Sequence, residues 1–402
     1  MSAAAAGHEG FAPLIVKVSI YNSMGTINLS EIQGEHFCSA PWTNLHINNH
    51  EQLKPCCGGH GLRRPVDESW SYLSGSDVEL NDIKHSLLNN QAHSYCDGCY
   101  ERSWYTEATD RQQIKINDVT DFSLYSLDVR WSSTCQLSCT YCNEGQSSTW
   151  AQLKARQKTI PIVVNRIGND NKQKLWDFLE SQKGTIKRIA MLGGEPLLLK
   201  ENLKILDMFD ESVKIEIMSN LNLDLDSNEI YQRAVRRPNV RWHISMENIG
   251  TRFEFVRRGS DWNLQQHNIK KLHQEFVSEI PITIQSQYCA YSALHLPELY
   301  DWFDQFDRLN ISLSEGLTNP ECLNFFQFPV KYKQQSLNDL EVCAEKYHRI
   351  AYNIEVVIQK LKDNFDCQDP AIVNRLIDWH QSRESKYFDN RFDFLKLWPE
   401  YA

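Results

Sequence analysis

Residues 124–142 read LYSLDVRWSSTCQLSCTYC, a strand-like run that leads directly into three cysteines within eight residues. The first part contains β-branched and aromatic residues and ends at serines, which predicts a β-strand. Cys135, Cys139 and Cys142 therefore occupy the loop after that strand. Three thiolates on one loop can hold a metal or an iron–sulfur cluster and leave one coordination position open. The spacing favours an iron–sulfur cluster, with zinc as the alternative, because zinc sites are usually built from paired elements.

Strand-like and helix-like segments alternate along the chain from residue 124 onward. Such a repeat predicts a parallel sheet, since parallel strands need crossover helices. We expect an α/β fold with a partial, TIM-like (βα)6 barrel, whose chemistry lies at the C-terminal ends of the strands. The predicted strands are 124–131, 186–192, 213–219, 240–245, 282–288 and 309–314. The predicted helices are 171–182, 200–209, 226–235, 263–278 and 295–306.

The overall composition limits the classes of partner and compartment. The chain has 402 residues and a formal net charge of −10, which argues against non-specific binding to nucleic acid. It has no apolar run of about 18 residues that would predict a membrane span. The N-terminus lacks the features of a secretory signal, so we expect a cytoplasmic location. In a reducing compartment, clustered members of the 12 cysteines are more typical of metal binding than of disulfides.

Five further cysteines gather in the N-terminal quarter, in a segment that differs from the rest of the chain. The alternation in TNLHIN followed by QLKPCC predicts a short hairpin with cysteines at its edge. So short a segment buries little core by itself, which indicates a small module stapled by metal. We therefore divide the chain into four regions. They are an N-terminal extension (1–35), a cysteine-rich module of a β-hairpin and a helix (36–106), a barrel (120–320) and a helical C-terminal region (321–402).

The pattern C-x3-C-x-aromatic-C after the first strand, with MLGGEPLL at 191–198 after the second, resembles the radical S-adenosylmethionine (SAM) superfamily. The resemblance implies that Cys135, Cys139 and Cys142 hold three irons of a [4Fe–4S] cluster and that SAM chelates the fourth. It also implies that one electron from the cluster cleaves SAM to a 5′-deoxyadenosyl radical, which abstracts a hydrogen atom from a substrate C–H bond. We therefore expect a radical SAM enzyme.

The same resemblance implies contacts to SAM near the ends of the predicted strands. Gly193 and Gly194 let the backbone approach a ligand closely, and Glu195 can accept a hydrogen bond from the amino group of SAM. The other implied contacts are Tyr141, Ser219, Asn220, Ser245, Glu247 and Arg257. Two of them have an alternative role: Ser245 could cap the turn that follows it, and Arg257 could be a solvated charge.

The N-terminal segments HFCSAPWTNLHINN, LKPCCGGHG and YCDGCYE resemble the auxiliary-cluster module called twitch, a short form of the SPASM domain, placed here before the barrel. This implies a second [4Fe–4S] cluster on Cys38, Cys96 and Cys99. Cys56 and Cys57 compete for the fourth position, because adjacent side chains rarely both face one cluster. A four-cysteine zinc site is the alternative for this module.

The resemblance also bears on substrate and partners. Twitch and SPASM enzymes mostly modify peptides, which implies a peptide substrate that is epimerised or crosslinked, and a reductant such as flavodoxin or ferredoxin. A sugar or nucleoside-like small molecule is the alternative substrate. A non-catalytic iron–sulfur or zinc interaction protein is the alternative from another class. Cys289, just past the fifth strand, could return a hydrogen atom to a substrate radical, or could simply be buried at a strand end.

Overall fold

The computed structural model describes residues 36–56, 59, 62–65, 77–103, 123–314, 316–317, 319–388 and 393–402. Within them the strands form one ten-stranded sheet, in the order β10-β9-β8-β7-β6-β5-β4-β1-β2-β3. The strands are β1 (Asn44–Ile47), β2 (Gln52–Lys54), β3 (Arg64–Pro65), β4 (Ser126–Arg130), β5 (Arg188–Leu192), β6 (Lys214–Ser219), β7 (Val240–Ser245), β8 (Ile282–Ser286), β9 (Leu309–Leu313) and β10 (Ala351–Tyr352).

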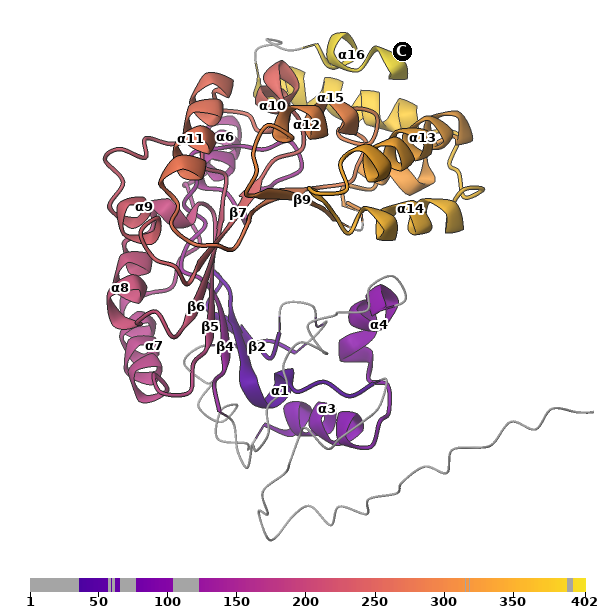
Figure 1. The fold of residues 1–402 in the computed structure, drawn as a ribbon. Coiled ribbons are helices and arrows are strands. Elements are labelled where there is room, and N and C mark those ends of the chain that lie inside the picture. The colour runs from indigo at the N-terminus through magenta and orange to yellow at the C-terminus, as the bar shows by residue number, and fades with distance from the viewer. Residues whose placement is uncertain are drawn as a thin grey trace, which may run out of the picture.

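The α-helices lie between and around these strands (Figure 1). Those before or within the barrel are α1 (Ala40–Thr43), α3 (Val78–Leu88), α4 (Asp97–Ser103), α6 (Ser148–Lys158), α7 (Asn169–Ser181), α8 (Lys200–Met208), α9 (Glu229–Ala234), α10 (Gly250–Val256), α11 (Trp262–Glu275) and α12 (Leu296–Phe303). Those after it are α13 (Val330–Lys346), α14 (Ile354–Asp363), α15 (Ile372–Tyr387) and α16 (Phe394–Leu397).

The six strands β4 to β9 are parallel neighbours in sequence order, which confirms the predicted α/β fold with its mainly parallel sheet. Each predicted strand overlaps an observed one, with ends that differ by at most two residues. Helices α7, α8, α9 and α11 cover the outer face of this curved sheet, while the other face is turned away from them (Figure 1). The sheet does not close, consistent with a partial barrel.

Alternation of side chains along each strand separates the core from the inner face. On β4, Leu127 and Val129 are fully buried, and the stacked rings of Trp131 and Trp176 of α7, 4.7 Å apart, extend the same layer toward the helices. Asp128 therefore points to the opposite, inner face. The core thus lies between the outer helices and one face of the sheet.

The N-terminal hairpin is part of the same sheet. Strand β1 pairs in parallel with β4, with Asn44 opposite Ser126 and Ile47 opposite Val129. Strands β2 and β3 then continue the sheet in antiparallel fashion. The sequence predicts the hairpin but not its hydrogen bonds to the first barrel strand. Those bonds place the N-terminal cysteines beside the strand that leads into the CQLSCTYC loop.

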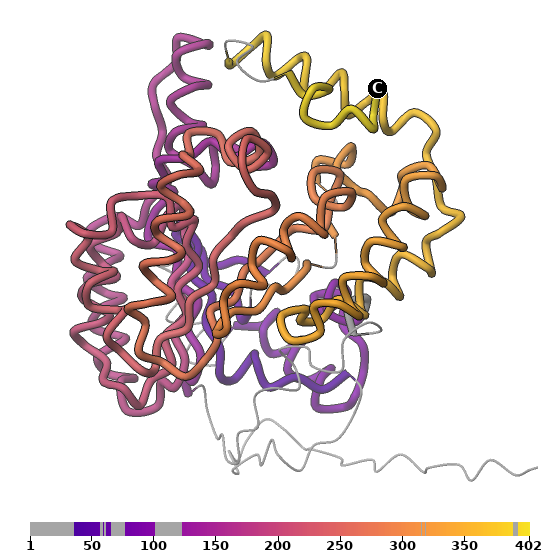
Figure 2. The backbone as a smooth tube through the Cα atoms, turned by 45° about the horizontal axis from the view of Figure 1, so that its top comes forward, coloured from indigo at the N-terminus to yellow at the C-terminus, as the bar shows by residue number. Residues whose placement is uncertain are grey.

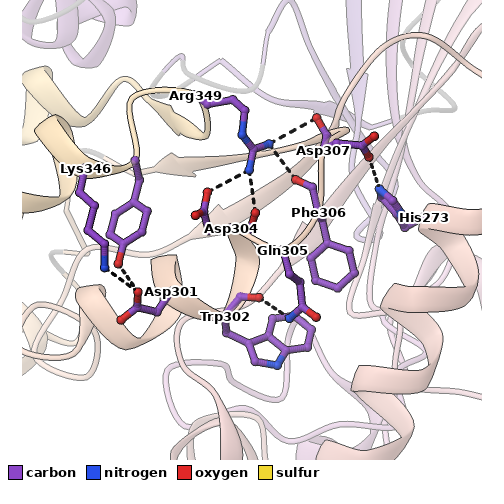
Figure 3. A network of polar contacts seen from close by, with 10 residues as sticks. His273, Asp301, Trp302, Asp304, Gln305, Phe306, Asp307, Lys346 and Arg349 are labelled. Atoms are coloured by element: carbon purple, nitrogen blue, oxygen red, sulfur yellow. Dashed lines mark hydrogen bonds and ion pairs between the residues drawn. The ribbon is translucent and has the colours of Figure 1, made fainter.

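The C-terminal helices follow the β9–β10 end of the sheet in the chain, and Figure 2 shows them as the orange and yellow part of the tube. A polar network joins them to the barrel (Figure 3). Arg349 donates to the carbonyl oxygens of Phe306 and Asp304, each at 2.8 Å, and Lys346 pairs with Asp301 at 2.9 Å. No helix in the described part of the chain is long and apolar enough to cross a membrane.

Candidate functional site

The loop 135–142 after β4 is held from two sides by hydrogen bonds. On one side the start of α6 binds its carbonyl groups: Thr149 donates to the Cys135 carbonyl at 2.7 Å, and the Trp150 indole donates to the Cys139 carbonyl at 2.9 Å. On the other side the loop's own amides donate to the chain after α10, as Thr140 does to the Val256 carbonyl at 2.8 Å. The loop is therefore fixed before any ligand binds.

The three thiols of this loop are half-buried and lie within electrostatic reach of one another. Burial, reinforced by Glu195 and Cys142, raises the pKa of Cys135 to about 12. Burial also raises the pKa of Cys139 and of Cys142. Three neighbouring thiols on one rigid loop fit a thiolate-ligated metal group by their donor set, since a bound metal ion deprotonates coordinating thiols despite the burial that raises their pKa values.

The GGEP loop after β5 packs directly against the residues that precede Cys135. A Cβ atom on Gly194 would lie 2.2 Å from the Thr134 carbonyl oxygen, so only glycine fits there. Gly193 has φ +134°, which strains any other residue. The sequence predicts a close approach to a ligand at these glycines. The structure shows that the close approach of Gly194 is to the backbone of the neighbouring loop.

Glu195 is fully buried and accepts three hydrogen bonds from the protein. The donors are the Ser219 hydroxyl at 2.8 Å, the Asn220 amide at 2.8 Å and the Leu197 amide at 3.1 Å. Burial raises the pKa of Glu195 to about 7, although these hydrogen bonds and the charge of Arg257 act in the opposite direction. The predicted residues Ser219 and Asn220 thus orient Glu195 beside Cys135.

Tyr141, Glu247 and Arg257 form a buried cluster next to the cysteines. Arg257 donates to both carboxylate oxygens of Glu247, from Nη2 at 2.8 Å and from Nε at 3.0 Å, and the Tyr141 hydroxyl donates to Oε1 at 3.0 Å. Burial opposes the charge on Arg257, but the Glu247 carboxylate raises its pKa. The charge of Arg257 partly offsets the burial that raises the pKa of Cys139, so a cation lies within electrostatic reach of that thiol.

Replacing Tyr141 by phenylalanine removes one hydrogen bond to a buried carboxylate. We expect a loss of about 2 kcal/mol in the free energy of unfolding, since hydrogen bonds to charged groups contribute roughly that much. Urea unfolding of the cluster-free chain measures it. The control is Tyr352→Phe, because Tyr352 is 63% exposed. If Tyr141→Phe were as stable as Tyr352→Phe, the hydrogen bond from Tyr141 to Glu247 would be contradicted.

Asn220 and Gln136 also lie beside the cysteine loop, and Gln136 is not among the residues predicted from the sequence. Asn220 donates to the Cys135 sulfur at 3.8 Å. Gln136 donates to the Asn220 side chain at 2.9 Å and thereby holds that amide. Gln136 lies between two cysteines, and that position is the signal that could have identified it.

Ser245 is half-buried at the end of β7, opposite Gln285 of β8.

Four N-terminal cysteines border one small cavity of about 20 Å³. They are Cys38, Cys56, Cys96 and Cys99, whereas Cys57 lies outside the described residues. Burial raises the pKa of Cys38, and that of Cys56 to about 11. In the described part of the chain, no three histidine, cysteine, aspartate or glutamate side chains converge on a point that a single metal ion could occupy.

Cys289 has no exposed surface. The residues around it are covered by the C-terminal segment, since Tyr401 donates to the Ala290 carbonyl at 2.7 Å and Trp398 to the Tyr291 carbonyl at 3.0 Å. Burial raises the pKa of Cys289 to about 12. A role in hydrogen-atom transfer stays a prediction, and the burial fits the alternative of a packed cysteine.

The inner face of the sheet carries charged side chains. Arg188 pairs with Asp128 at 2.7 Å and with Glu216 at 2.6 Å, and Lys214 pairs with Glu216 at 2.6 Å. The His46 side chain of β1 lies 3.7 Å from the Asp128 carboxylate, so the N-terminal hairpin contacts this group of charged side chains. The face below the cysteine loop therefore offers hydrogen-bonding groups instead of an apolar surface.

Comparisons with known proteins agree with this arrangement of loops. Residues 129–285 match the family model described as the Radical SAM superfamily. No curated protein matches the sequence. The similar solved structures include anSMEcpe with bound AdoMet, with 16% identity over 56% of this chain and 61% of that one and a TM-score of 0.40. This chain therefore covers less than two thirds of that protein.

Two further solved structures are similar to parts of the chain. One is Streptococcus suis SuiB bound to precursor peptide SuiA, with 12% identity over 69% of this chain and 60% of that one and a TM-score of 0.39. The other is TYW1 with a lysine-pyruvate adduct bound, with 12% identity, 53% and 70% coverage and a TM-score of 0.30. The residues that match the radical SAM family model include β5 to β7, nearly all of β8, the cysteine loop, Glu195 and Arg257.

Proposed function

We propose that this chain is a radical SAM enzyme that abstracts a hydrogen atom from a C–H bond of a peptide. The observation that carries the proposal is the meeting of two loops. The loop after β4 bears Cys135, Cys139 and Cys142, and the loop after β5 brings the buried carboxylate of Glu195 against it. Three thiols beside one oriented carboxylate suit a [4Fe–4S] cluster whose open iron is taken by SAM.

A bound cluster with SAM would supply the one-electron radical chemistry that removes the hydrogen atom from the substrate. The chain itself positions these groups. Cys135, Cys139 and Cys142 bind the cluster, and Glu195 accepts hydrogen bonds from the amino group of SAM. Asn220 donates to the Cys135 sulfur and so stabilises its thiolate.

The remaining predicted contacts serve SAM through a shared scaffold. Glu247 holds both Tyr141 and Arg257, so these two side chains have fixed positions beside the cysteines. In this proposal Tyr141 and Arg257 present their outer surfaces to SAM, together with Ser245 at the end of β7. The backbone at Gly193 belongs to the same wall in this proposal, because a Cβ atom there would lie 3.0 Å from the Ser132 carbonyl oxygen, three residues before Cys135.

We further propose an auxiliary [4Fe–4S] cluster in the N-terminal cavity, bound by Cys38, Cys56, Cys96 and Cys99. Its four thiols line one common cavity, and four cysteine thiolates are the usual ligands of such a cluster. A single zinc ion requires sulfur atoms that converge to about 2.3 Å from one point. Cys56 is the fourth ligand in this proposal, since its side chain lines the cavity.

The substrate in this proposal is a peptide, which is epimerised or crosslinked, and the electron comes from a protein such as flavodoxin or ferredoxin. The charged inner face supports a substrate rich in hydrogen-bonding groups, as a peptide backbone is. A sugar or nucleoside would use the same groups, so the experiment below includes all three classes.

The test is anaerobic incubation of the iron-reconstituted chain with SAM and dithionite. We expect release of 5′-deoxyadenosine, measured by liquid chromatography. Deuterated peptides, sugars and nucleosides are then added one class at a time, and the true substrate transfers deuterium into the 5′-deoxyadenosine. Absence of 5′-deoxyadenosine from a sample with a full complement of iron would refute the enzyme and favour a non-catalytic iron–sulfur protein.

A further inference from the structure

The C-terminal helix α15 brings one arginine to the cysteine loop, although it lies outside the matched radical SAM domain. The guanidinium of Arg383 lies 4.2 Å from the ring centre of Trp150 and 4.5 Å from that of Trp379. Trp150 in turn donates to the Cys139 carbonyl at 2.9 Å. A single indole ring therefore links this cation to the backbone that carries the cluster cysteines.

Arg383 has no carboxylate partner among the residues that the structure describes, and its Nη2 atom is buried without a hydrogen bond. Two nearby arginines are paired, Arg257 with Glu247 and Arg258 with Glu384. Arg383 itself is half-buried, but its buried Nη2 is a donor without an acceptor, which is costly. An anion beside it, which the described residues do not provide, would offset that cost.

The ionisable groups that interact with Arg383 include the hydroxyls of Tyr291 and Tyr387, the thiols of Cys142 and Cys322, and the imidazole of His380. Of these, only Cys142 belongs to the cysteine loop. A thiol that coordinates a metal is deprotonated, so Cys142 becomes a permanent anion when a cluster is bound. The missing partner of Arg383 is then the charge of the cluster and its thiolates.

We propose that Arg383 is the counter-ion of the SAM-binding cluster on its Cys142 side and makes that cluster easier to reduce. The inference rests on the proposed function. The cluster gains one electron and no proton on reduction, so its net negative charge grows. A nearby cation stabilises the more negative state, and net charge is one of the factors that set the potentials of such clusters. Arg383 is a positioning and electrostatic residue in this role, not a catalytic one.

The experiment is a redox titration of the anaerobically reconstituted full chain, followed by electron paramagnetic resonance. The signal to follow is the one that changes on addition of SAM, which separates this cluster from the auxiliary one. Arg383→Met keeps the bulk between the two indole rings and removes the charge. At a fixed solution potential we expect the ratio of reduced to oxidised cluster to fall about tenfold, as loss of a charge near the site implies.

Two variants separate electrostatics from packing. Arg383→Lys keeps the charge but loses the planar stacking, and we expect it to stay close to wild type. Arg375→Gln is the matched control, since Arg375 lies on the same helix, is exposed and pairs with Asp369. If Arg383→Met binds no cluster, Arg383→Gln replaces it in the comparison with Arg383→Lys.

Two outcomes overturn the inference by itself: an unchanged ratio in the neutral variant, or an equal fall in the neutral and lysine variants. Either result would leave Arg383 as a packing residue while the wild-type cluster and its response to SAM stand. A wild-type chain without any SAM-sensitive signal would instead refute the proposed function, and this inference with it. The two failures are therefore distinguishable.

Discussion

Simultaneous replacement of Cys135, Cys139 and Cys142 by alanine is expected to remove about half of the iron from the reconstituted chain and to abolish 5′-deoxyadenosine formation. Each [4Fe–4S] cluster holds four irons, so two clusters give about eight irons per chain and one gives about four. The three thiols share one loop, so the triple replacement removes the whole proposed ligand set of the SAM-binding cluster.

Iron and sulfide per chain, together with chromatography of 5′-deoxyadenosine, measure this result. The complementary variant replaces Cys38, Cys56, Cys96 and Cys99 with alanine. It is also expected to retain about four irons, but it keeps the SAM-sensitive signal. Cys367→Ala is the control, because Cys367 is exposed and lies in the C-terminal region. Zinc in place of iron, or full iron content in the triple variant, would contradict the assignment.

Gly194→Ala is expected to cost about 3 kcal/mol in the free energy of unfolding, at the upper end for overpacking. The added methyl group would lie 2.2 Å from the Thr134 carbonyl oxygen and 2.6 Å from its carbonyl carbon. These atoms belong to the backbone between β4 and Cys135, so no side-chain rotation can relieve the clash. The loop with Cys135 must move away, and we expect weaker iron binding as a second effect.

Urea unfolding of the cluster-free chain and iron content after reconstitution provide the two measurements. Gly184→Ala is the matched control, because no atom lies within 4 Å of the Cβ position there. Its expected change is within about 0.5 kcal/mol. If Gly194→Ala behaved like this control, the packing of the GGEP loop against Thr134 would be wrong.

Much of the barrel could be predicted from the sequence because its signals are local. Each of the six parallel strands combines apolar periodicity with a polar end, and the helices between them follow the same rule. Helix α6 is not among the predicted helices, although the Ser147 side chain caps it by accepting a hydrogen bond from the Trp150 amide. Its sequence, STWAQLKARQK, is mainly polar, so apolar periodicity gives little signal there.

The parts of the site that could not be predicted depend on contacts distant in sequence. Nothing local in GGEP indicates that Gly194 faces the Thr134 carbonyl instead of a ligand. The choice between Cys56 and Cys57 depends on which thiol faces the cavity. Arg383 lies more than 200 residues from the cysteine loop, and only the fold brings α15 against α6.

The hydrogen-bonded pairing of β1 with β4 has a consequence for electron transfer. Modules joined by small interfaces usually swing relative to each other. Here the ladder that runs from Asn44 to Ile47 joins the segment that follows Cys38 to the strand that leads into the cysteine loop. The sheet therefore limits how far the Cys38 side of the N-terminal cavity can move relative to that loop. An electron that passes between two bound clusters would then depend less on a hinge motion to gate its rate.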